Sequence, residues 1–343
     1  MDKQIAIVIL NWNGRELLER FLPSVIAHTP AEQADVIVAD NGSTDDSLEL
    51  LQTKFPTVKT ICLDRNYGFA EGYNQALKPI NHPYTVLLNS DVEVTPGWLD
   101  APIAALEKEA DIAAVQPKIR AQRNKDFFEY AGAAGGFMDR YGYPYCRGRV
   151  FDVVEKDEGQ YDAPAEILWA TGACLFIRTQ VYKEAGGLDA GFFAHQEEID
   201  LCWRLRSRGY RLVCTPQSVV YHVGGATLNA ESPRKTFLNF RNNLLMLYKN
   251  LPEKDLKQVM RIRFWLDYLA AIRFLLGGNF SNACAVHEAR RAFHKLKPAY
   301  ASARQENLAQ TRVTAIPELR RKSLLFSFYL KRQKTFAALQ ANR

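Results

Sequence analysis

A short apolar run that ends beside acids constrains the fold more than any other part of the chain. The stretch at residues 84–94, between Pro83 and Pro96, is a short apolar run that carries acids only at its far end, at Asp91 and Glu93. A run of this length is too short for a helix, and its composition predicts a buried strand. In an open parallel sheet, ligands bind in the crevice at the carboxyl ends of the strands. Asp91 is therefore a candidate ligand residue, although solvated turn residues give the same pattern.

Three similar apolar runs precede it, and each leads into a polar loop and a helical pattern; they occupy residues 5–10, 36–39 and 58–62. Strands that alternate with helices predict a parallel sheet with helices on both faces. The loops after parallel strands fall on one edge of the sheet. We therefore expect Asp40, Asn66 and Asp91 to converge although they lie far apart in the sequence.

The common phosphate-binding motifs are missing from this edge. No Gly-x-Gly-x-x-Gly follows the first strand and no Gly-Lys-Ser/Thr occurs in the chain, so neither a dinucleotide fingerprint nor a P-loop is supported. Asp91, with Asn89 and Glu93 near it, offers oxygen ligands for a divalent cation, and such a cation commonly binds together with a diphosphate. We therefore expect phosphate binding through a metal.

The second half of the chain is less regular. The apolar period is lost from about residue 118 to residue 160, which predicts short strands and loops, and it returns at residues 167–177. Acids at residues 197–200 precede an amphipathic helix, a pattern that the helix dipole alone also favours. Residues 211–214 and 219–222 are predicted to be two short strands, the second of which ends at His222.

Charge divides the chain into an acidic body and a basic tail. Residues 231–343 contain 22 Lys and Arg against 7 Asp and Glu, a net charge of +15, whereas residues 1–230 contain 22 against 31, a net charge of −9. A cationic tail suggests a polyanionic partner, either an anionic membrane surface or nucleic acid. A basic face that is merely solvated is the alternative.

The cysteines and the start of the chain both indicate the cytoplasm. The six cysteines show no Cys-x-x-Cys pairing and lie mostly among apolar neighbours, which favours reduced, buried thiols over a zinc site or a disulfide framework. The first residues lead directly into a strand pattern, without the cleavage site of a secretory signal.

Seven segments share one family pattern: VILNWNG at 8–14, VIVADNGSTDDS at 36–47, NYGFAEGYN at 66–74, LLNSDVEV at 87–94, TGACLFIR at 171–178, FFAHQEEIDLCWRLRSRGY at 192–210 and YHVGGAT at 221–227. In this order they resemble the family 2 glycosyltransferases of GT-A fold, in particular the bacterial rhamnosyltransferase-like enzymes. The resemblance implies an α/β fold with a Rossmann-like, mostly parallel sheet, formed by residues 1–230, and a helical, basic C-terminal extension formed by residues 231–343.

The resemblance also implies a donor site. Asp40, Asn41 and Ser43 are expected to hold the base and ribose of a nucleotide-sugar. Asp91 takes the place of the last acid of the family's D-x-D motif, which ligates Mg²⁺ or Mn²⁺, and His222 matches a histidine that completes the metal or diphosphate site. Further donor-site residues are expected at Asn11, Asn66, Gly68, Phe69, Asn89 and Ser90.

On the acceptor side, Glu198 falls where the family usually has an Asp that acts as general base, with Glu197 and Asp200 as second choices. A displacement at an anomeric carbon needs such a base and a Lewis acid at the departing diphosphate. A single displacement inverts the configuration of that carbon. The sugar and acceptor pocket is expected at Trp169, Thr171, Gly172 and Ala173.

The tail contains two apolar stripes. Residues 261–276 are interrupted by Asp267 and Arg273 and cannot supply the roughly 20 apolar residues that span a bilayer. Such a helix can lie in the membrane interface, and residues 323–330 have the same character. Packing of both stripes against the catalytic domain or a second subunit, in a homodimer, is the alternative.

Together these observations predict an inverting glycosyltransferase. We expect it to transfer a sugar, rhamnose among the candidates, from a dTDP- or UDP-sugar to a lipid-linked or cell-surface glycan such as O-antigen, on the inner face of the cytoplasmic membrane. Transfer to a polyprenyl phosphate and an inactive GT-A scaffold are the alternatives. A nucleic-acid partner is disfavoured, because the aromatic residues of the tail lie in apolar stripes and the acidic body repels phosphate.

Overall fold

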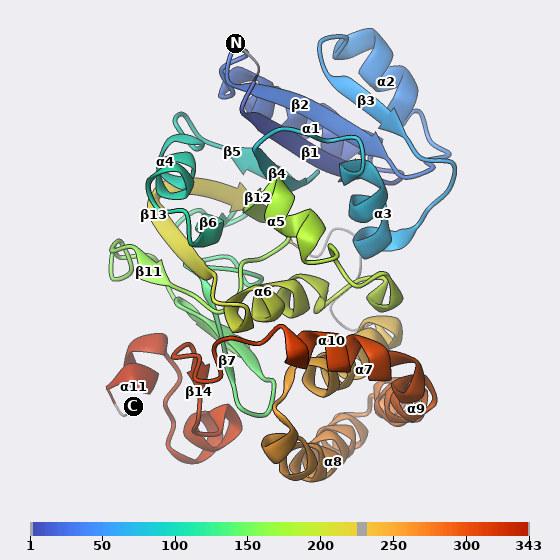
Figure 1. The fold of residues 1–343 in the computed structure, drawn as a ribbon, viewed down its shortest axis with the longest axis vertical. Helices are drawn as coiled ribbons and strands as arrows, with labels where there is room; N and C mark the ends of the chain where they lie inside the picture. Colours follow the sequence, from blue (N-terminus) through green and yellow to red (C-terminus); the bar gives the residue numbers. More distant parts are fainter. Residues whose placement is uncertain (1–2, 225–231, 342–343) are drawn as a thin grey trace.

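The computed structural model describes residues 3–224 and 232–341. Strands in these ranges form a nine-stranded main sheet and a smaller five-stranded sheet, and helices pack around both (Figure 1). The predicted boundary after residue 230 and the last residues of the motif at 221–227 lie outside the described residues.

The strands of the main sheet are β1 (Ile5–Asn11), β2 (Ala34–Asp40), β3 (Lys59–Cys62), β4 (Tyr84–Asn89), β5 (Val92–Val94), β6 (Ile112–Ala121), β11 (Ala165–Glu166), β12 (Cys174–Arg178) and β13 (Arg211–His222). Those of the smaller sheet are β7 (Gly136–Asp139), β8 (Pro144–Cys146), β9 (Arg149–Val150), β10 (Val153–Val154) and β14 (Leu319–Arg320). The α-helices are α1 (Arg15–Ala27), α2 (Ser47–Lys54), α3 (Gly68–Leu77), α4 (Asp100–Lys108), α5 (Thr179–Glu184), α6 (Glu197–Ser207), α7 (Pro233–Asn250), α8 (Glu253–Leu276), α9 (Phe280–Leu296), α10 (Ala301–Ala309) and α11 (Phe336–Gln340).

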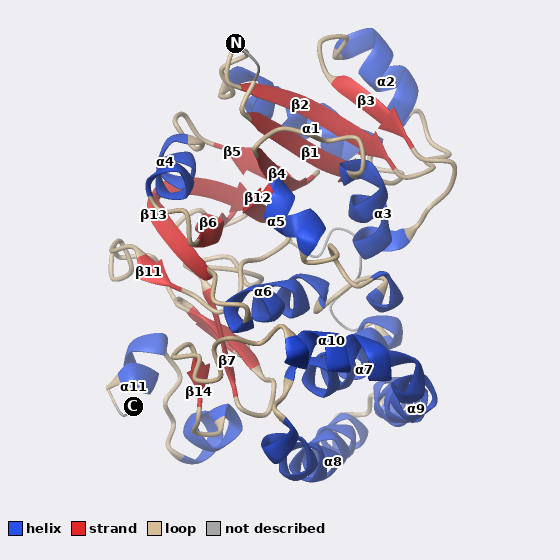
Figure 2. Cartoon of the chain, in the orientation of Figure 1, coloured by secondary structure: helices blue, strands red, loops and turns tan. Residues whose placement is uncertain are grey.

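The main sheet is mostly parallel, with helices on both of its faces (Figure 2). Strands β3, β2, β1 and β4 lie side by side and parallel, β12 runs antiparallel between β4 and β6, and β6 is again parallel to β13. Successive residues of β1 face two separate cores: Ile7 belongs to the core that α1, α2 and α4 cover, and Val8 to the core of α3, α5 and α6. The predicted fold class is confirmed.

The apolar pattern does not predict the long strand β6. The sequence loses its period near residue 118, whereas β6 runs on to Ala121 between β12 and β13. Two buried polar side chains break the pattern. Gln116 donates to the carbonyl of Gly132 (3.1 Å), and Lys118 forms an ion pair with Asp157 (3.0 Å). Both groups are satisfied inside the fold, so the strand tolerates them.

Two further strand predictions have the wrong boundaries. The two strands expected at 211–214 and 219–222 are one strand, β13, whose pairing with β6 shifts between Thr215 and Val219. Pro216 lies in this shift, where a residue without an N–H is tolerated. The run at 84–94 is also divided, because β5 pairs antiparallel with the end of β13. Asp91 therefore lies in the turn between β4 and β5.

The tail is built into the same body as the first part of the chain. Helix α7 packs against α6 and α9, and β14 joins β7 in the smaller sheet. One hydrophobic cluster contains Leu201 of α6, Leu244 of α7 and Phe336 of α11. In the described ranges, no helix is both long enough and apolar enough to cross a membrane.

A buried charge cluster fixes α8 to α9. Asp267 is fully buried and accepts hydrogen bonds from Arg263 (3.0 and 2.9 Å) and from Arg290 of α9. Arg263 also donates to the carbonyl of Tyr141 (2.7 Å). Two guanidinium groups thus depend on one carboxylate for their counter-charge.

We expect the substitution Asp267→Ala to lower the free energy of unfolding by about 3–5 kcal/mol, because it leaves two buried cations without a counter-ion. Equilibrium urea unfolding measures this loss. Asp255→Ala, on the same helix but partly exposed and in its first turn, is the matched control and should cost less than about 1 kcal/mol. Equal losses in the two variants would contradict the buried-cluster account.

Candidate active site

The loops after β1 and β2 meet as predicted. The amide nitrogen of Asn11 donates to Asp40 Oδ1 and to Ser43 Oγ (3.2 Å each), and the backbone N–H of Ser43 donates to Asp40 Oδ2 (2.9 Å). Asp40 is buried, and Asn11 Oδ1 is buried without a hydrogen-bond partner among the described residues. A buried acceptor without a partner is costly unless a ligand pairs with it, so this corner is suited to binding a polar group.

Asn41 and Asn66 form the wall of this corner. The side chain of Asn41 donates to the carbonyl of Gly68 (3.0 Å) and to Asn66 Oδ1 (3.2 Å), and Asn66 Oδ1 also accepts from the Gly68 N–H (2.8 Å). These contacts join the loop after β2 to the loop after β3. The two amides therefore order the loops, and their predicted direct contact with a nucleotide stays a prediction.

The start of α3 lies against the turn that precedes α6. Gly68 has φ +79°, and a Cβ at this position would lie 2.6 Å from the ring of Phe193. The next N–H, that of Phe69, donates to the carbonyl of Phe193 (2.9 Å). This contact brings the predicted donor loop next to the segment that carries the acids Glu197 and Glu198.

Asp91 and His222 form a buried pair at the predicted metal position. Asp91 Oδ1 lies 3.1 Å from His222 Nε2, and the amide nitrogen of Asn89 lies 3.4 Å from the same atom. They meet because His222 pairs with Val92 in the β5–β13 ladder. Ser90 lies beside them in the β4–β5 turn.

Sequence reasoning missed Glu129, which lies on the other side of the imidazole. Glu129 Oε1 is 3.5 Å from His222 Nδ1, and a Cβ at Gly224 would lie 2.7 Å from the same carboxylate oxygen. Burial lowers the pKa of His222, but the charges of Glu129 and Asp91 outweigh it and raise the pKa to about 10. No sequence signal marks Glu129, because it belongs to the irregular region before β7.

The pair fits a divalent cation. A carboxylate oxygen and an imidazole nitrogen that has lost its proton suit Mn²⁺, so binding here would require His222 to release a proton. Mg²⁺ usually binds one or two carboxylates together with substrate phosphates. Glu129 supplies the outer carboxylate that commonly orients a ligating histidine. Within the described residues, no group of three or more His, Cys, Asp or Glu side chains could hold a metal by itself, so a cation here would need further ligands from the diphosphate or water.

Helix α6 begins with the three predicted acids, and the structure separates them by environment. Asp200 is fully buried, and it is bound by Arg204 (2.9 Å), Lys249 (2.8 Å) and Asn250 (2.8 Å). Burial raises its pKa, but Lys249 and Arg204 outweigh this effect and lower it. A carboxylate with both oxygens bound is a poor proton acceptor, so the structure favours a structural role for Asp200.

Glu197 and Glu198 are free of such partners. Each has its Oε2 atom buried without a hydrogen-bond partner among the described residues, and Glu198 is the one of the two that is partly exposed. Burial raises the pKa of Glu198 to about 7, and burial together with the charge of Glu198 raises the pKa of Glu197 well above its usual range. A partly accessible carboxylate with a pKa near neutrality suits a general base.

The turn that presents these acids is strained and is held from behind. Phe193, His195 and Gln196 all have positive φ, at 66°, 70° and 73°. Asn242 of α7 donates from one amide nitrogen to the carbonyls of residues 192, 194 and 195 (2.8–2.9 Å), and Asn243 donates to Gln196 Oε1 (3.1 Å). Strain of this kind persists where surrounding contacts enforce it, often at functional sites. The Arg-Asn-Asn sequence of α7 was the available signal for these residues.

Of the four residues predicted to line the sugar and acceptor pocket, Gly172 and Ala173 contact predicted donor-site residues, whereas Trp169 and Thr171 are buried. Trp169 is buried in the core, and its indole N–H donates to the carbonyl of Phe137 (2.8 Å), so the structure does not present it to a ligand. Thr171 is also buried, with its N–H bound to Gln116 (2.9 Å). The neighbouring Ala173 carbonyl accepts from the Asn89 N–H (3.0 Å), and Gly172 packs close to the ring of Phe69.

A family model decides the identity of the chain. The model described as "Glycosyl transferase family 2" matches residues 6–181, a range that runs from β1 to α5 and contains the Asp40 and Asp91 loops. The chain belongs to glycosyl transferase family 2. The suspected family is thus confirmed, and with it the assignment of this protein as a glycosyltransferase that uses a nucleotide-sugar.

The names of two relatives refer to glycan synthesis. The glycosyltransferase is 26% identical over 240 residues to the N-acetylglucosaminyl-diphospho-decaprenol L-rhamnosyltransferase of Mycobacterium tuberculosis, a match that covers 65% of this chain and 76% of that protein. It is 25% identical over 277 residues to the O-antigen biosynthesis protein RfbC of Myxococcus xanthus, which covers 80% of this chain and 19% of RfbC.

Solved structures confirm the GT-A fold of the glycosyltransferase. The mannosyltransferase PcManGT from Pyrobaculum calidifontis, solved in complex with GDP-Man and Mn²⁺, aligns with a TM-score of 0.52 and 13% identity. The alignment covers 90% of this chain and 84% of that one, so the likeness includes the helical tail.

The raised pKa of Glu198 predicts a cost in stability. A carboxyl group whose pKa rises from 4.5 to about 7 on folding stabilises the fold below pH 4.5 and loses that contribution as the pH rises through about 7. We therefore expect Glu198→Gln to have a higher melting temperature than the wild type at pH 8 and nearly the same at pH 4.5, as measured by differential scanning calorimetry. A difference independent of pH would contradict the assignment.

Proposed function

We propose that this enzyme is an inverting glycosyltransferase that transfers a sugar from a dTDP- or UDP-sugar to a lipid-linked or cell-surface glycan. The observation that carries the proposal is the acid pair Glu197 and Glu198, each with an Oε2 atom that has no hydrogen-bond partner among the described residues. The pair directly follows a strained turn that contacts the start of α3. One accessible base beside a nucleotide-binding edge is the arrangement that a single displacement at an anomeric carbon requires. Such a displacement inverts that carbon.

The donor is assigned to the edge formed by β1, β2 and β4. Asp40, Asn11 and Ser43 would bind the nucleoside by hydrogen bonds, and Asp91 with His222 would hold Mg²⁺ or Mn²⁺ beside the diphosphate. When bound, the cation supplies positive charge that neutralises the departing diphosphate. The protein contributes the position of these groups, which the hydrogen bonds of Asn41 and the ion pair between Glu129 and His222 maintain.

The acceptor is assigned to the side of α6. Glu198, the more exposed member of the acid pair, would take the proton from the attacking hydroxyl. Because Glu197 lies beside it, it is unfavourable for both carboxyl groups to be ionised at once. Glu197 remains the alternative base. Asn242 holds the turn from behind and so fixes the position of both carboxylates.

The names of the two relatives support a deoxyhexose donor and a lipid-linked acceptor, since one is a rhamnosyltransferase acting on a diphospho-decaprenol sugar and the other is an O-antigen protein. Transfer to a polyprenyl phosphate is the second candidate, which the basic tail would also suit. An inactive scaffold is the third, motivated by Asn89 in place of an acid and by Glu198 in place of Asp.

A ligand that binds only the folded protein raises its melting temperature. The test therefore measures the melting temperature of the protein in UDP, dTDP, GDP or CMP, each with and without Mn²⁺. We expect UDP or dTDP to stabilise the protein only with Mn²⁺, by about 2.7 kcal/mol at a concentration 100 times the dissociation constant. Asp91→Asn should abolish this shift, and the matched control Asp100→Asn, on an exposed site of α4, should keep it. An unchanged shift in Asp91→Asn would refute the metal assignment.

Transfer should depend on pH through one ionisation near 7. Because the base must be deprotonated, kcat/KM for the identified donor and acceptor should rise about tenfold per pH unit below pH 7 and level off above it. Glu198→Gln should lower kcat about 10²–10⁴-fold while donor binding in the thermal assay persists. Full activity in Glu198→Gln together with loss in Glu197→Gln would move the base to Glu197.

A further inference from the structure

Helix α8 carries charged residues on its buried face and apolar residues on its exposed face. The buried face consists of Val259, Arg263, Asp267 and Ala271. Residues spaced by three and four share one face of a helix, and the face opposite this one carries Trp265, Leu269, Ile272 and Leu276. These four side chains are 69%, 60%, 51% and 86% exposed. An ordinary surface helix has the reverse arrangement.

Neighbouring segments extend this apolar surface. Phe280, at the start of α9, is 69% exposed, and Phe326 and Leu330 of the tail are 51% and 71% exposed. In the same tail segment Leu324 and Phe328 are buried, so packing against the protein accounts for only part of the apolar stripe at 323–330. We call the exposed side chains from α8, α9 and this segment the apolar surface. Contiguous exposed apolar surface marks an interaction site.

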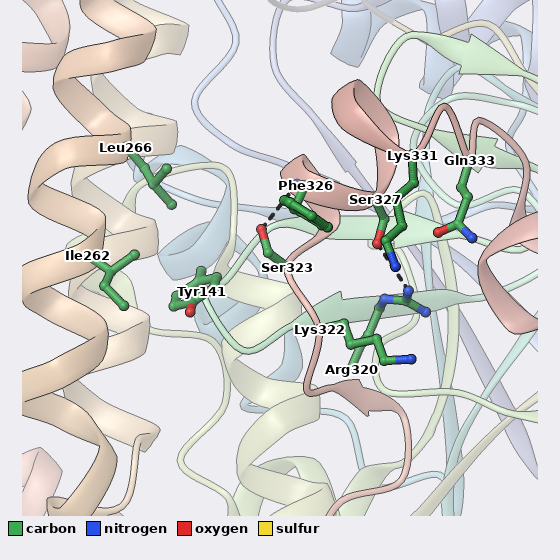
Figure 3. A pocket seen from close by; sticks show the side chains of 10 residues that line it. All are labelled: Tyr141, Ile262, Leu266, Arg320, Lys322, Ser323, Phe326, Ser327, Lys331 and Gln333. Atoms are coloured by element: carbon green, nitrogen blue, oxygen red, sulfur yellow. Dashed lines mark hydrogen bonds between the residues drawn. The ribbon is translucent and has the colours of Figure 1, made fainter. Parts of the chain in front are cut away.

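Cations lie beside the apolar surface. Residues 319–334 contain six Lys and Arg and no acid, and Lys331, Arg332 and Lys334 are exposed and form no ion pair with a described residue. A cavity of about 430 Å³ between α8 and this segment brings the two kinds of side chain together (Figure 3). Ile262 and Phe326 line it, together with Lys331.

We propose that the apolar surface and the exposed cations of residues 321–334 dock the enzyme on an anionic lipid bilayer. Trp, Leu and Ile side chains bury their apolar groups at the boundary between headgroups and acyl chains, and nearby Lys and Arg are attracted to anionic headgroups. Helix α8 would then lie in the plane of the interface. The sugar transfer of the proposed function does not require this docking, so the two proposals fail independently.

A second copy of the chain fits this surface less well than a bilayer does. A two-fold interface presents the same patch from both subunits. Here it would bring two clusters of cations together, each with Asp152 beside Arg332 and Lys334 but with an excess of positive charge, and like charges facing each other weaken an interface. Docking through α8 also leaves the donor edge accessible, because α8 and strands β2 and β3 lie at opposite ends of the molecule (Figure 1).

The test measures binding of the full chain to sedimented vesicles, without a sugar donor. We expect binding to vesicles of 70% phosphatidylcholine and 30% phosphatidylglycerol at 0.1 M salt, weak binding to pure phosphatidylcholine, and a clear loss at 0.5 M salt. Lys331→Ala/Arg332→Ala/Lys334→Ala should weaken partitioning by about 100-fold. The control triple Lys78→Ala/Lys108→Ala/Arg123→Ala removes the same charge from exposed sites elsewhere and should have little effect.

The apolar contribution is tested by Trp265→Ala/Leu269→Ala, which should weaken partitioning at least tenfold. Trp12→Ala, at a tryptophan that is 49% exposed far from α8 in the sequence, is the matched control and should bind normally. Circular dichroism and the melting temperature verify that each variant is folded. Absent vesicle binding, or equal binding by the variants and controls, would overturn the proposal. A concentration-dependent dimer lost in Trp265→Ala/Leu269→Ala, or tighter binding to an RNA oligonucleotide than to the anionic vesicles, would also overturn it.

Discussion

The contact between Asp91 and His222 is the constraint on which the candidate site depends. It joins the turn after β4 to the end of β13, two segments more than a hundred residues apart, and it exists because β5 pairs with the last residues of β13. Both side chains are buried, so their neighbours must orient them. Glu129 does this for the imidazole, and Gly224 leaves room for that carboxylate. The turn after β4, the end of β13 and the segment before β7 thus meet at the imidazole ring of His222.

Much of the fold follows from local sequence, because buried parallel strands are continuous apolar runs with polar ends. Strands β1, β2 and β4 and the convergence of Asp40 with its neighbours could be predicted for this reason, whereas β3 is a mostly exposed edge strand. The long strand β6 could not, since Gln116 and Lys118 are satisfied by residues that become neighbours only in the folded chain. The division at Ser90 and Asp91 depends in the same way on pairing with β13.

The roles of the candidate-site residues could likewise be predicted only in part from the sequence. The sequence identifies three acids at the start of α6, but it cannot distinguish them. Lys249 and Asn250 of α7 bind Asp200, whereas Glu197 and Glu198 keep an oxygen without a hydrogen-bond partner in the described part of the chain. Trp169 is predicted to line the pocket, yet a close glycine, Gly136, lets the smaller sheet pack directly on its ring. Burial set by distant segments decides the role of each residue.

The bonds from Asn242 to the turn before α6 have a consequence for how this enzyme can be altered. The turn before the acid pair is held by Asn242 of α7, and α7 packs against α6 and α9, so the tail helps to set the positions of Glu197 and Glu198. A chimaera that joins this catalytic half to the tail of a relative would inherit a differently shaped turn unless Asn242 and its three carbonyl partners were transferred as a unit. Exchange of the tail at residue 230 would therefore separate the turn before α6 from the Asn242 side chain that holds it.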